Sequence, residues 1–94
     1  MIDINLPGEF TQAFATKIPA QRFYINEMMA EGVITNYSLA IDRRKLWVVV
    51  EAKNEEEVMN ILADFPIIDD INFDIHELMF HNSAAFTFPA FSLN

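Results

Sequence analysis

The chain contains no cysteine and only two glycines among its 94 residues. The lack of cysteine excludes disulfides, thiolate metal sites and a cysteine nucleophile. Two glycines are too few for a glycine-rich phosphate-binding loop. No apolar run approaches the ~18 residues that span a bilayer, and residues 1–7 have neither the basic start nor the apolar run of a signal peptide. We therefore expect a cytoplasmic protein.

Basic residues are absent from the second part of the chain. Residues 54–94 carry eight acids and no Lys or Arg, whereas residues 1–53 carry six acids and six bases. The net charge is −8. Nucleic-acid backbones and anionic membranes both require a basic footprint on the protein. The sequence therefore predicts neither nucleic acid nor membrane as a partner.

Hydrophobic residues are abundant for so short a chain. They make up 52% of it, and aromatic residues make up 13%, which excludes a disordered chain. The length is that of one domain. A domain of this size buries only about 60–65% of its unfolded surface. We therefore expect another subunit to cover part of the apolar surface, as in a homodimer or a higher homo-oligomer.

The first part of the chain predicts one strand followed by a helical region. Residues 1–6 alternate between apolar and polar side chains, which is typical of a half-buried strand. Residues 10–18 follow helical spacing. Pro19 lacks a backbone donor, so it either kinks this helix or lies in the first turn of a new one, and we favour the second. Gly32 is placed to end the helix as its C-cap.

The remainder predicts three strands and a second helix. Strands are expected over residues 33–41 and 45–52, and the three residues between them permit only an antiparallel hairpin. Asn54 and Glu57 form a capping box that starts a helix. Residues 71–80 alternate again as a fourth strand.

This order of elements predicts an α+β fold of the ferredoxin-like type, βαββαβ. Such a fold has a four-stranded antiparallel sheet with both helices on one face. We assign residues 1–83 to this domain and residues 84–94 to an apolar C-terminal tail. The tail contains Phe86, Phe88 and Phe91, so it either folds back on its own chain or docks on a neighbouring subunit.

Strand alternation predicts which side chains share a face of the sheet. The face toward the helices is expected to carry Ile2, Ile4, Leu6, Val33, Tyr37, Leu39, Val48, Val50, Phe73 and Ile75. The opposite face is expected to carry Asp3, Asn5, Asn36, Ser38, Trp47, Val49, Glu51, Asp74, His76, Leu78 and Phe80. Large apolar side chains among polar ones are typical of an interface. Two such faces packed together would form a dimeric α+β barrel.

Five polar residues stand out as candidates for chemistry, and four of them follow from the residues alone. His76 lies two positions from Asp74 on one strand face, so it could be a base that Asp74 orients, or simply an interface histidine. Tyr37 could position a ligand from the helix side or fill the core. Arg22 could bind a ligand carboxylate between sheet and helices, or be solvated.

Metal binding finds no support in the pattern of candidate ligands. His76 and His81 are five residues apart, which places them on opposite faces of a strand. Asp69 and Asp70 are adjacent acids, either a metal- or lysine-binding pair or a solvated turn, and we favour the turn. We therefore predict no metal site.

Residues 65–75 read Phe-Pro-Ile-Ile-Asp-Asp-Ile-Asn-Phe-Asp-Ile, followed by Leu78 and by His81-Asn82-Ser83. The run from the fourth strand onward resembles the muconolactone isomerase family, which carries Leu-Pro-Leu-Phe-Pro-Tyr-Met-Asp-Ile-Glu-Val, then a Leu and a His-x-Ser. The helix end at Glu31-Gly32 also matches. The resemblance covers about half the chain. It implies a dimeric α+β barrel and a cofactor-free proton shift on an unsaturated lactone.

The second strand departs from that family. Where the family has arginines and a histidine, this chain has Thr35, Leu39 and Asn36, and a family glutamate falls near Gln21. These departures disfavour muconolactone isomerase activity itself. Asn36 replaces the family's histidine and is our fifth candidate, as a ligand contact. Two hypotheses follow: a binder of a small unsaturated lactone or related compound with isomerase-like chemistry, or a noncatalytic oligomeric ligand-binding or assembly module.

Overall fold

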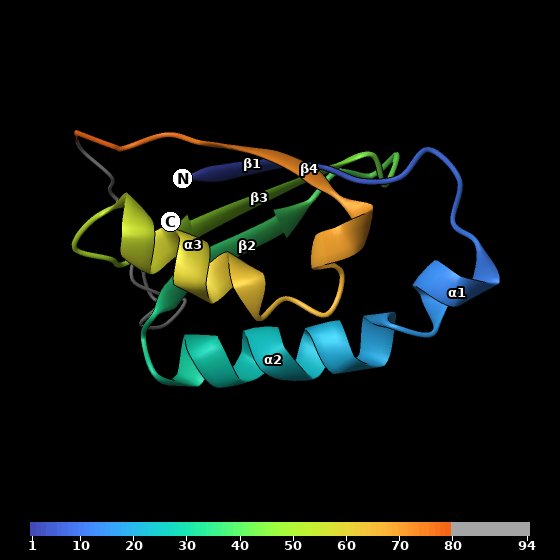
Figure 1. The fold of residues 1–94 in the computed structure, drawn as a ribbon, viewed down its shortest axis with the longest axis horizontal. Helices are drawn as coiled ribbons and strands as arrows, with labels where there is room; N and C mark the ends of the chain where they lie inside the picture. Colours follow the sequence, from blue (N-terminus) through green and yellow to red (C-terminus); the bar gives the residue numbers. More distant parts are fainter. Residues whose placement is uncertain (80–94) are drawn as a thin grey trace, which may run out of the picture.

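The computed structural model describes residues 1–79 of the chain (Figure 1). Its elements are β1 (Ile2–Asn5), α1 (Gln12–Ala15), α2 (Ile18–Ala30), β2 (Ile34–Leu39), β3 (Lys45–Val50), α3 (Glu55–Ala63), the 3-10 turn η1 (Ile68–Asp70) and β4 (Asn72–Ile75). The strands form one antiparallel sheet in the order β2-β3-β1-β4. The predicted α+β class and four-stranded antiparallel sheet are confirmed, and the topology is compatible with a ferredoxin-like fold.

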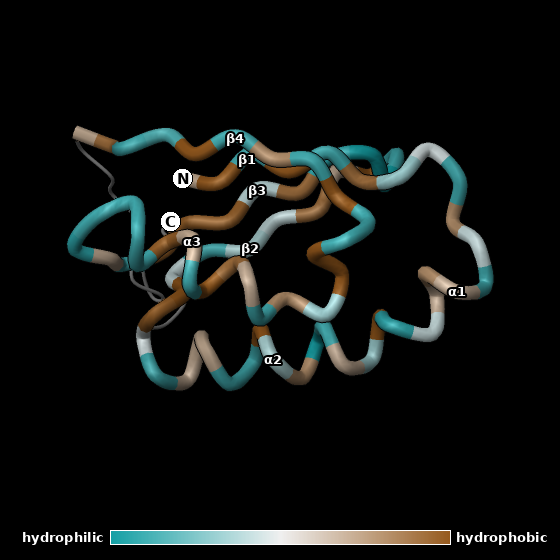
Figure 2. The backbone as a smooth tube through the Cα atoms, in the orientation of Figure 1, coloured by the Kyte–Doolittle hydropathy of each residue, from teal (hydrophilic) through white to brown (hydrophobic). Residues whose placement is uncertain are grey.

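Both long helices lie on the same side of the sheet (Figure 1). The strand register places one set of apolar side chains toward them, because Ile2 pairs with Val48 and Ile75, and Ile4 pairs with Leu46 and Phe73. Ile2, Ile4 and Val48 are fully buried. Figure 2 shows β3 as a nearly continuous hydrophobic strand within the sheet. The predicted alternation therefore holds for β1, β3 and β4.

The face assignment of β2 needs one correction. The pairing register shifts between Ile34 and Asn36, so one extra residue interrupts the alternation. Ile34, only 1% exposed, faces the core in place of Val33, which was predicted there. After the shift, Tyr37 pairs with Val48 and faces the helices as predicted. The strand also ends at Leu39, because Ala40 and Ile41 belong to the turn.

Pro19 separates two helices, as favoured from the sequence. Thr11 caps α1, and its Oγ1 accepts a hydrogen bond of 3.1 Å from the Phe14 backbone N–H. Pro19 occupies the first turn of α2, where its missing donor costs nothing. Gly32 follows α2 with φ of +77°, a conformation that glycine adopts without strain.

The α3 helix begins at the predicted cap. Asn54 Oδ1 accepts a hydrogen bond of 2.9 Å from the Glu57 N–H. The Glu57 carboxylate accepts one of 3.0 Å from the Lys53 N–H, which is one residue before the cap residue that a capping box would use. Val58 and Leu62 are the buried residues of α3. The side chains of Asn54 and Glu57 thus bind two backbone N–H groups at the start of α3.

The segment from α3 to β4 completes the core. Phe65, Ile67 and Ile71 are all at most 8% exposed. Asp70 is not simply a solvated turn residue as favoured from the sequence, because its carboxylate pairs with Lys17 Nζ at 2.7 Å. This ion pair joins η1 to the start of α2.

Two strands end earlier in the structure than predicted, and some predictions concern residues outside the described range. The predicted strand over residues 71–80 is too long, because β4 spans only Asn72–Ile75 and residues 76–79, including His76, follow it outside any strand. Phe80 and the tail over residues 84–94 lie outside residues 1–79. Likewise, β3 ends at Val50, two residues before the predicted end. Within residues 1–79, no helix has the length and apolar character required to cross a bilayer.

Candidate functional site

A buried amide lies between α2 and the sheet. Gln21 follows Ile18 and precedes Ile25 at helical spacing, so it shares their inward face. It is only 3% exposed, and it is the one polar residue among the buried residues of the described part of the chain. Neither its Oε1 nor its Nε2 makes a hydrogen bond that satisfies geometric limits within residues 1–79. A buried amide without such a bond is uncommon, because it loses hydration without full compensation.

The Tyr37 hydroxyl is the neighbour of this amide. Burial raises the pKa of Tyr37 above its usual value, while the Gln21 side chain and the Arg22 guanidinium act in the opposite direction. The net effect keeps the hydroxyl protonated at neutral pH. Tyr37 lies on β2, an edge strand, and Arg22 is exposed on α2. Two of the sequence candidates, Tyr37 and Arg22, are thus brought together, and Gln21 joins them.

We call Gln21, Arg22 and Tyr37 the α2 polar cluster. It presents an amide donor, a hydroxyl donor and a guanidinium cation at the edge of an otherwise apolar layer. Hydrogen-bond donors and a cation stabilise a carboxylate or an enolate oxygen. The cluster holds no general base, because the only acid–base group inside it is a tyrosine whose pKa is raised.

Asn36 lies apart from this cluster. It pairs with Val49, so it shares the opposite face of the sheet, whereas Tyr37 faces the helices. Its side chain is half-buried. The register shift before Asn36 sets this orientation. A ligand held by Tyr37 and Arg22 would therefore not reach Asn36 within one chain.

Asp74 and His76 lie at the other edge of the sheet. Asp74 pairs with Asp3 across β1 and β4, and the His76 N–H donates a 2.7 Å hydrogen bond to the Met1 carbonyl. Both side chains are exposed, and among residues 1–79 no hydrogen bond or ion pair joins them. Four adjacent strands span roughly 14 Å between β2 and β4. The candidate base is therefore remote from the α2 polar cluster.

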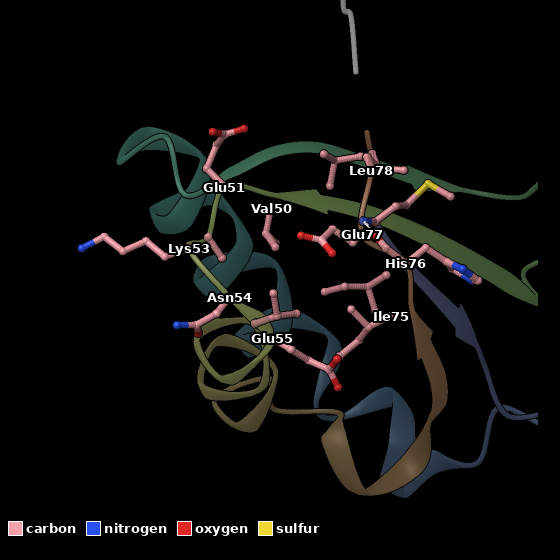
Figure 3. Close-up of a pocket in the computed structure, with 14 residues that line it drawn as sticks. Val50, Glu51, Lys53, Asn54, Glu55, Ile75, His76, Glu77 and Leu78 are labelled. Atoms are coloured by element: carbon pink, nitrogen blue, oxygen red, sulfur yellow. Dashed lines mark hydrogen bonds between the residues drawn. The ribbon is translucent and has the colours of Figure 1, made fainter. Parts of the chain in front are cut away.

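A hollow of about 580 Å³ opens at the end of the sheet where β3 ends and α3 begins. Seven aliphatic residues line it: Ile2, Val49, Val50, Ala52, Val58, Ile75 and Leu78. Figure 3 shows the Glu77 side chain directed toward Val50, with Ile75 beneath it. His76 also lines the hollow, but its ring points away from Val50. We call this space the sheet-end hollow.

Carboxylates dominate the charge of the sheet-end hollow. Glu51, Glu55 and Glu77 all line it. Lys53 also lines it, yet Figure 3 shows its side chain extended outward, away from Val50. The Met1 amino group donates a hydrogen bond to the His76 carbonyl, and burial lowers its pKa. An anion would meet repulsion in this space.

A second, more open hollow of about 350 Å³ lies between α2 and α3. The Tyr24 hydroxyl in its wall donates a 3.0 Å hydrogen bond to the Ile61 carbonyl. Burial raises the pKa of Tyr24, and the nearby charges of Asp64 and Glu31 raise it further. The hydroxyl is thus engaged in the fold, and the charged groups that line this hollow, Glu51, Glu57 and Asp64, are all acidic.

Sequence reasoning missed Gln21 as a site residue. The available signal was a polar residue in the apolar stripe of α2. The sheet-end hollow was also missed, because strand alternation does not show where a strand end meets a helix start. Within residues 1–79, no group of three or more His, Asp or Glu side chains is placed to hold a metal ion.

Two comparisons of the chain with known proteins gave no match. No model of a protein family matches the chain, and a search of curated proteins yields no significant match.

Proposed function

We propose that this protein binds a small, partly apolar molecule at the α2 polar cluster, in the manner of a muconolactone isomerase-like binder. The ligand class is an unsaturated lactone or a related compound with a carbonyl or carboxylate oxygen. The observation that supports this proposal is the buried Gln21 amide, which interacts with the Tyr37 hydroxyl but makes no hydrogen bond of good geometry within residues 1–79. A ligand oxygen would supply the amide with a well-formed hydrogen bond.

Charge favours the α2 polar cluster over the sheet-end hollow for this ligand class. A proton shift in an unsaturated lactone passes through an enolate, whose negative charge needs donors or a cation. Arg22 supplies the cation, and Gln21 and Tyr37 supply the donors. The sheet-end hollow offers carboxylates instead, and these would oppose the developing charge.

Binding has more support than catalysis within one chain. A proton shift needs a base within hydrogen-bond reach of the carbon that loses its proton. His76, our candidate base with Asp74, lies on the far edge of the sheet from the cluster. The arrangement therefore supports ligand binding better than isomerisation, which would also require a base beside the ligand. No cofactor enters this proposal.

A thermal unfolding series tests the proposal. A panel of butenolides and short unsaturated carboxylic acids is added to the full chain at neutral pH. A compound at ten times its Kd should stabilise the protein by about 1.4 kcal/mol, which raises Tm by several degrees. Gln21→Leu should fold and lose this shift. Gln12→Leu, which changes an exposed glutamine on α1, should keep it.

Two outcomes would contradict the proposal. If no compound of the panel shifts Tm of the wild-type protein, the cluster does not bind this ligand class. If Gln21→Leu responds as strongly as the wild type, the ligand binds elsewhere. Turnover is read separately, from the ultraviolet absorbance of the same compounds over time.

A second candidate function is homo-oligomeric assembly through the open face of the sheet. Trp47 supports it, because this large aromatic lies between Asp3 and Ser38 on the face opposite the helices and is only half-buried. An aromatic anchor among polar residues is characteristic of interfaces. Light scattering at micromolar concentration should give a dimer or larger species, and Trp47→Glu should reduce its mass to that of one chain. A monomeric wild type would contradict this candidate.

A further inference from the structure

The sheet-end hollow has the size of a small-molecule site. Its volume of about 580 Å³ falls within the roughly 300–1,000 Å³ of typical ligand pockets. Its wall is largely polar, and the half-buried Val50 and Ile75 add aliphatic surface to it. Such a wall favours a ligand that has both a polar group and a small apolar body.

Among residues 1–79, one carboxylate that is directed into the hollow forms no ion pair. The charge of Glu55 lies in the first turn of α3, where the positive end of the helix dipole stabilises it. The Glu51 side chain extends away from Val50 in Figure 3. Glu77 extends toward Val50, over the aliphatic surface, and no ion pair involves it among residues 1–79. Glu77 is therefore the charge that a ligand would meet.

We propose that the sheet-end hollow binds a small amphipathic amine, with its ammonium group on Glu77 and its apolar body against Val50 and Ile75. An alkylammonium ion supplies the donors that a carboxylate accepts, and its charge matches the excess of acids in the wall. This site differs from the α2 polar cluster in position and in the sign of its charge. The two proposals therefore stand or fall independently.

Calorimetric titration of the full chain with matched probes tests this assignment. Cyclohexylmethylamine, cyclohexylmethanol and cyclohexanecarboxylate share one apolar ring and carry positive, zero and negative charge at pH 7.5. The amine should bind, the alcohol should bind about tenfold more weakly or not at all, and the carboxylate should not bind. Equal binding of amine and alcohol, or the absence of binding by the amine, would overturn the assignment.

Paired variants locate the charge that carries the binding. Glu77→Gln keeps the shape of the side chain and should weaken amine binding about five- to tenfold, while leaving any binding of the alcohol unchanged. Glu56→Gln removes an exposed acid of α3 that does not line the hollow, and it should leave the amine Kd unchanged. If both variants weaken binding equally, the effect is one of net charge and the assignment to Glu77 fails.

One further probe separates a free amine from a lysine side chain of a partner. N-acetyl-lysine methylamide carries the same ammonium group on a linear chain with a peptide backbone. Weaker binding than that of cyclohexylmethylamine supports the small-molecule assignment, because the ring covers more of the aliphatic surface. Tighter binding would assign the hollow to a protein partner and overturn it.

Discussion

The two faces of the sheet differ in the side chains that they carry and in how far these side chains are buried. On the face toward α2 and α3, Ile2, Ile4 and Val48 have no exposed surface. On the open face, Asp3 and Asp74 oppose each other across β1 and β4, and Trp47 is the adjacent residue of β3. The covered face is an apolar core, and the open face is largely polar but carries Trp47 and the buried Val49.

This contrast shows which residues are informative on each face. A polar group is exceptional within the covered layer, so Gln21 calls for an explanation and polar residues of the open face do not. On the open face the exception is apolar, which directs attention to Trp47. The residue that departs from its surroundings is in each case the better candidate for function.

The largest effect should come from the covered face. Phe65 is 1% exposed, and its ring packs edge-on against Tyr24 at a centroid distance of 5.6 Å. Phe65→Ala should lower the free energy of unfolding by about 3–5 kcal/mol, because it leaves a cavity in a close-packed core. Urea denaturation measures this loss.

Trp47→Ala is the matched change on the open face. In a monomer it should cost about 1 kcal/mol or less, since a half-exposed side chain has less surface to lose. A loss as large as that of Phe65→Ala at high protein concentration, which shrinks on dilution, would show that a second chain covers Trp47. Equal losses that do not depend on concentration would contradict the contrast between the faces.

Local patterns were sufficient to predict most of this fold. The spacing of apolar residues marks the strands and helices, and Pro19, Gly32 and Asn54 mark helix ends through backbone chemistry. The sequence did not predict that Ile34, and not Val33, faces the core. The position of a bulge depends on how β2 pairs with β3 and not on either strand alone. The Lys17–Asp70 pair joins residues that are 53 positions apart, which no local pattern reveals.

The candidate site was less predictable than the fold. Sequence reasoning placed Tyr37 on the helix-facing side of the sheet and Arg22 between sheet and helices, but it did not predict that the two lie close together. The role of Gln21 depends on its making no hydrogen bond of good geometry within residues 1–79, which is a property of the packed interior. Asn36, Asp74 and His76 were predicted on the open face. Asn36 lies on β2 and Asp74 on β4, at opposite edges of the sheet, and His76 follows the end of β4.

The next effect on stability should come from Gln21, the polar side chain buried under the covered face of the sheet. Gln21→Leu replaces an amide that makes no hydrogen bond of good geometry within residues 1–79 by an aliphatic side chain of similar size in an apolar layer. We expect the free energy of unfolding to rise by about 1 kcal/mol, because the desolvation cost of the amide disappears. Gln12→Leu, at an exposed position, should change it by less than about 0.5 kcal/mol. Destabilisation by Gln21→Leu would mean that the amide is satisfied within the fold.

A third prediction compares the two tyrosines at alkaline pH. Burial is the main cause that raises the pKa of both Tyr37 and Tyr24 above the usual value of 10.0. The folded state therefore holds these protons more tightly than the unfolded state. The stabilisation is complete below pH 10 and is lost as pH rises through the folded-state pKa values.

Urea midpoints at pH 8 and pH 10.5, read from Trp47 fluorescence, measure this effect. The midpoint of the wild type should fall at the higher pH, and Tyr37→Phe should reduce the fall. Absorbance at 295 nm should show the chain's two tyrosines titrating above pH 10. A tyrosine that ionises below pH 10 in the folded protein would contradict the assigned burial.

The smallest effect should come from the like charges of the open face. Asp3 and Asp74 are directly opposed, although Lys45 Nζ lies 2.5 Å from Asp3 Oδ1 and offsets part of their repulsion. Asp74→Asn should therefore raise the free energy of unfolding by only about 0.2–0.5 kcal/mol, and 1 M salt should abolish the gain. Asp69→Asn removes the same charge from an exposed position in η1 and should produce a smaller gain. If the two variants gain equally, the net charge of the chain, and not the opposed pair, sets the cost of acids on this face.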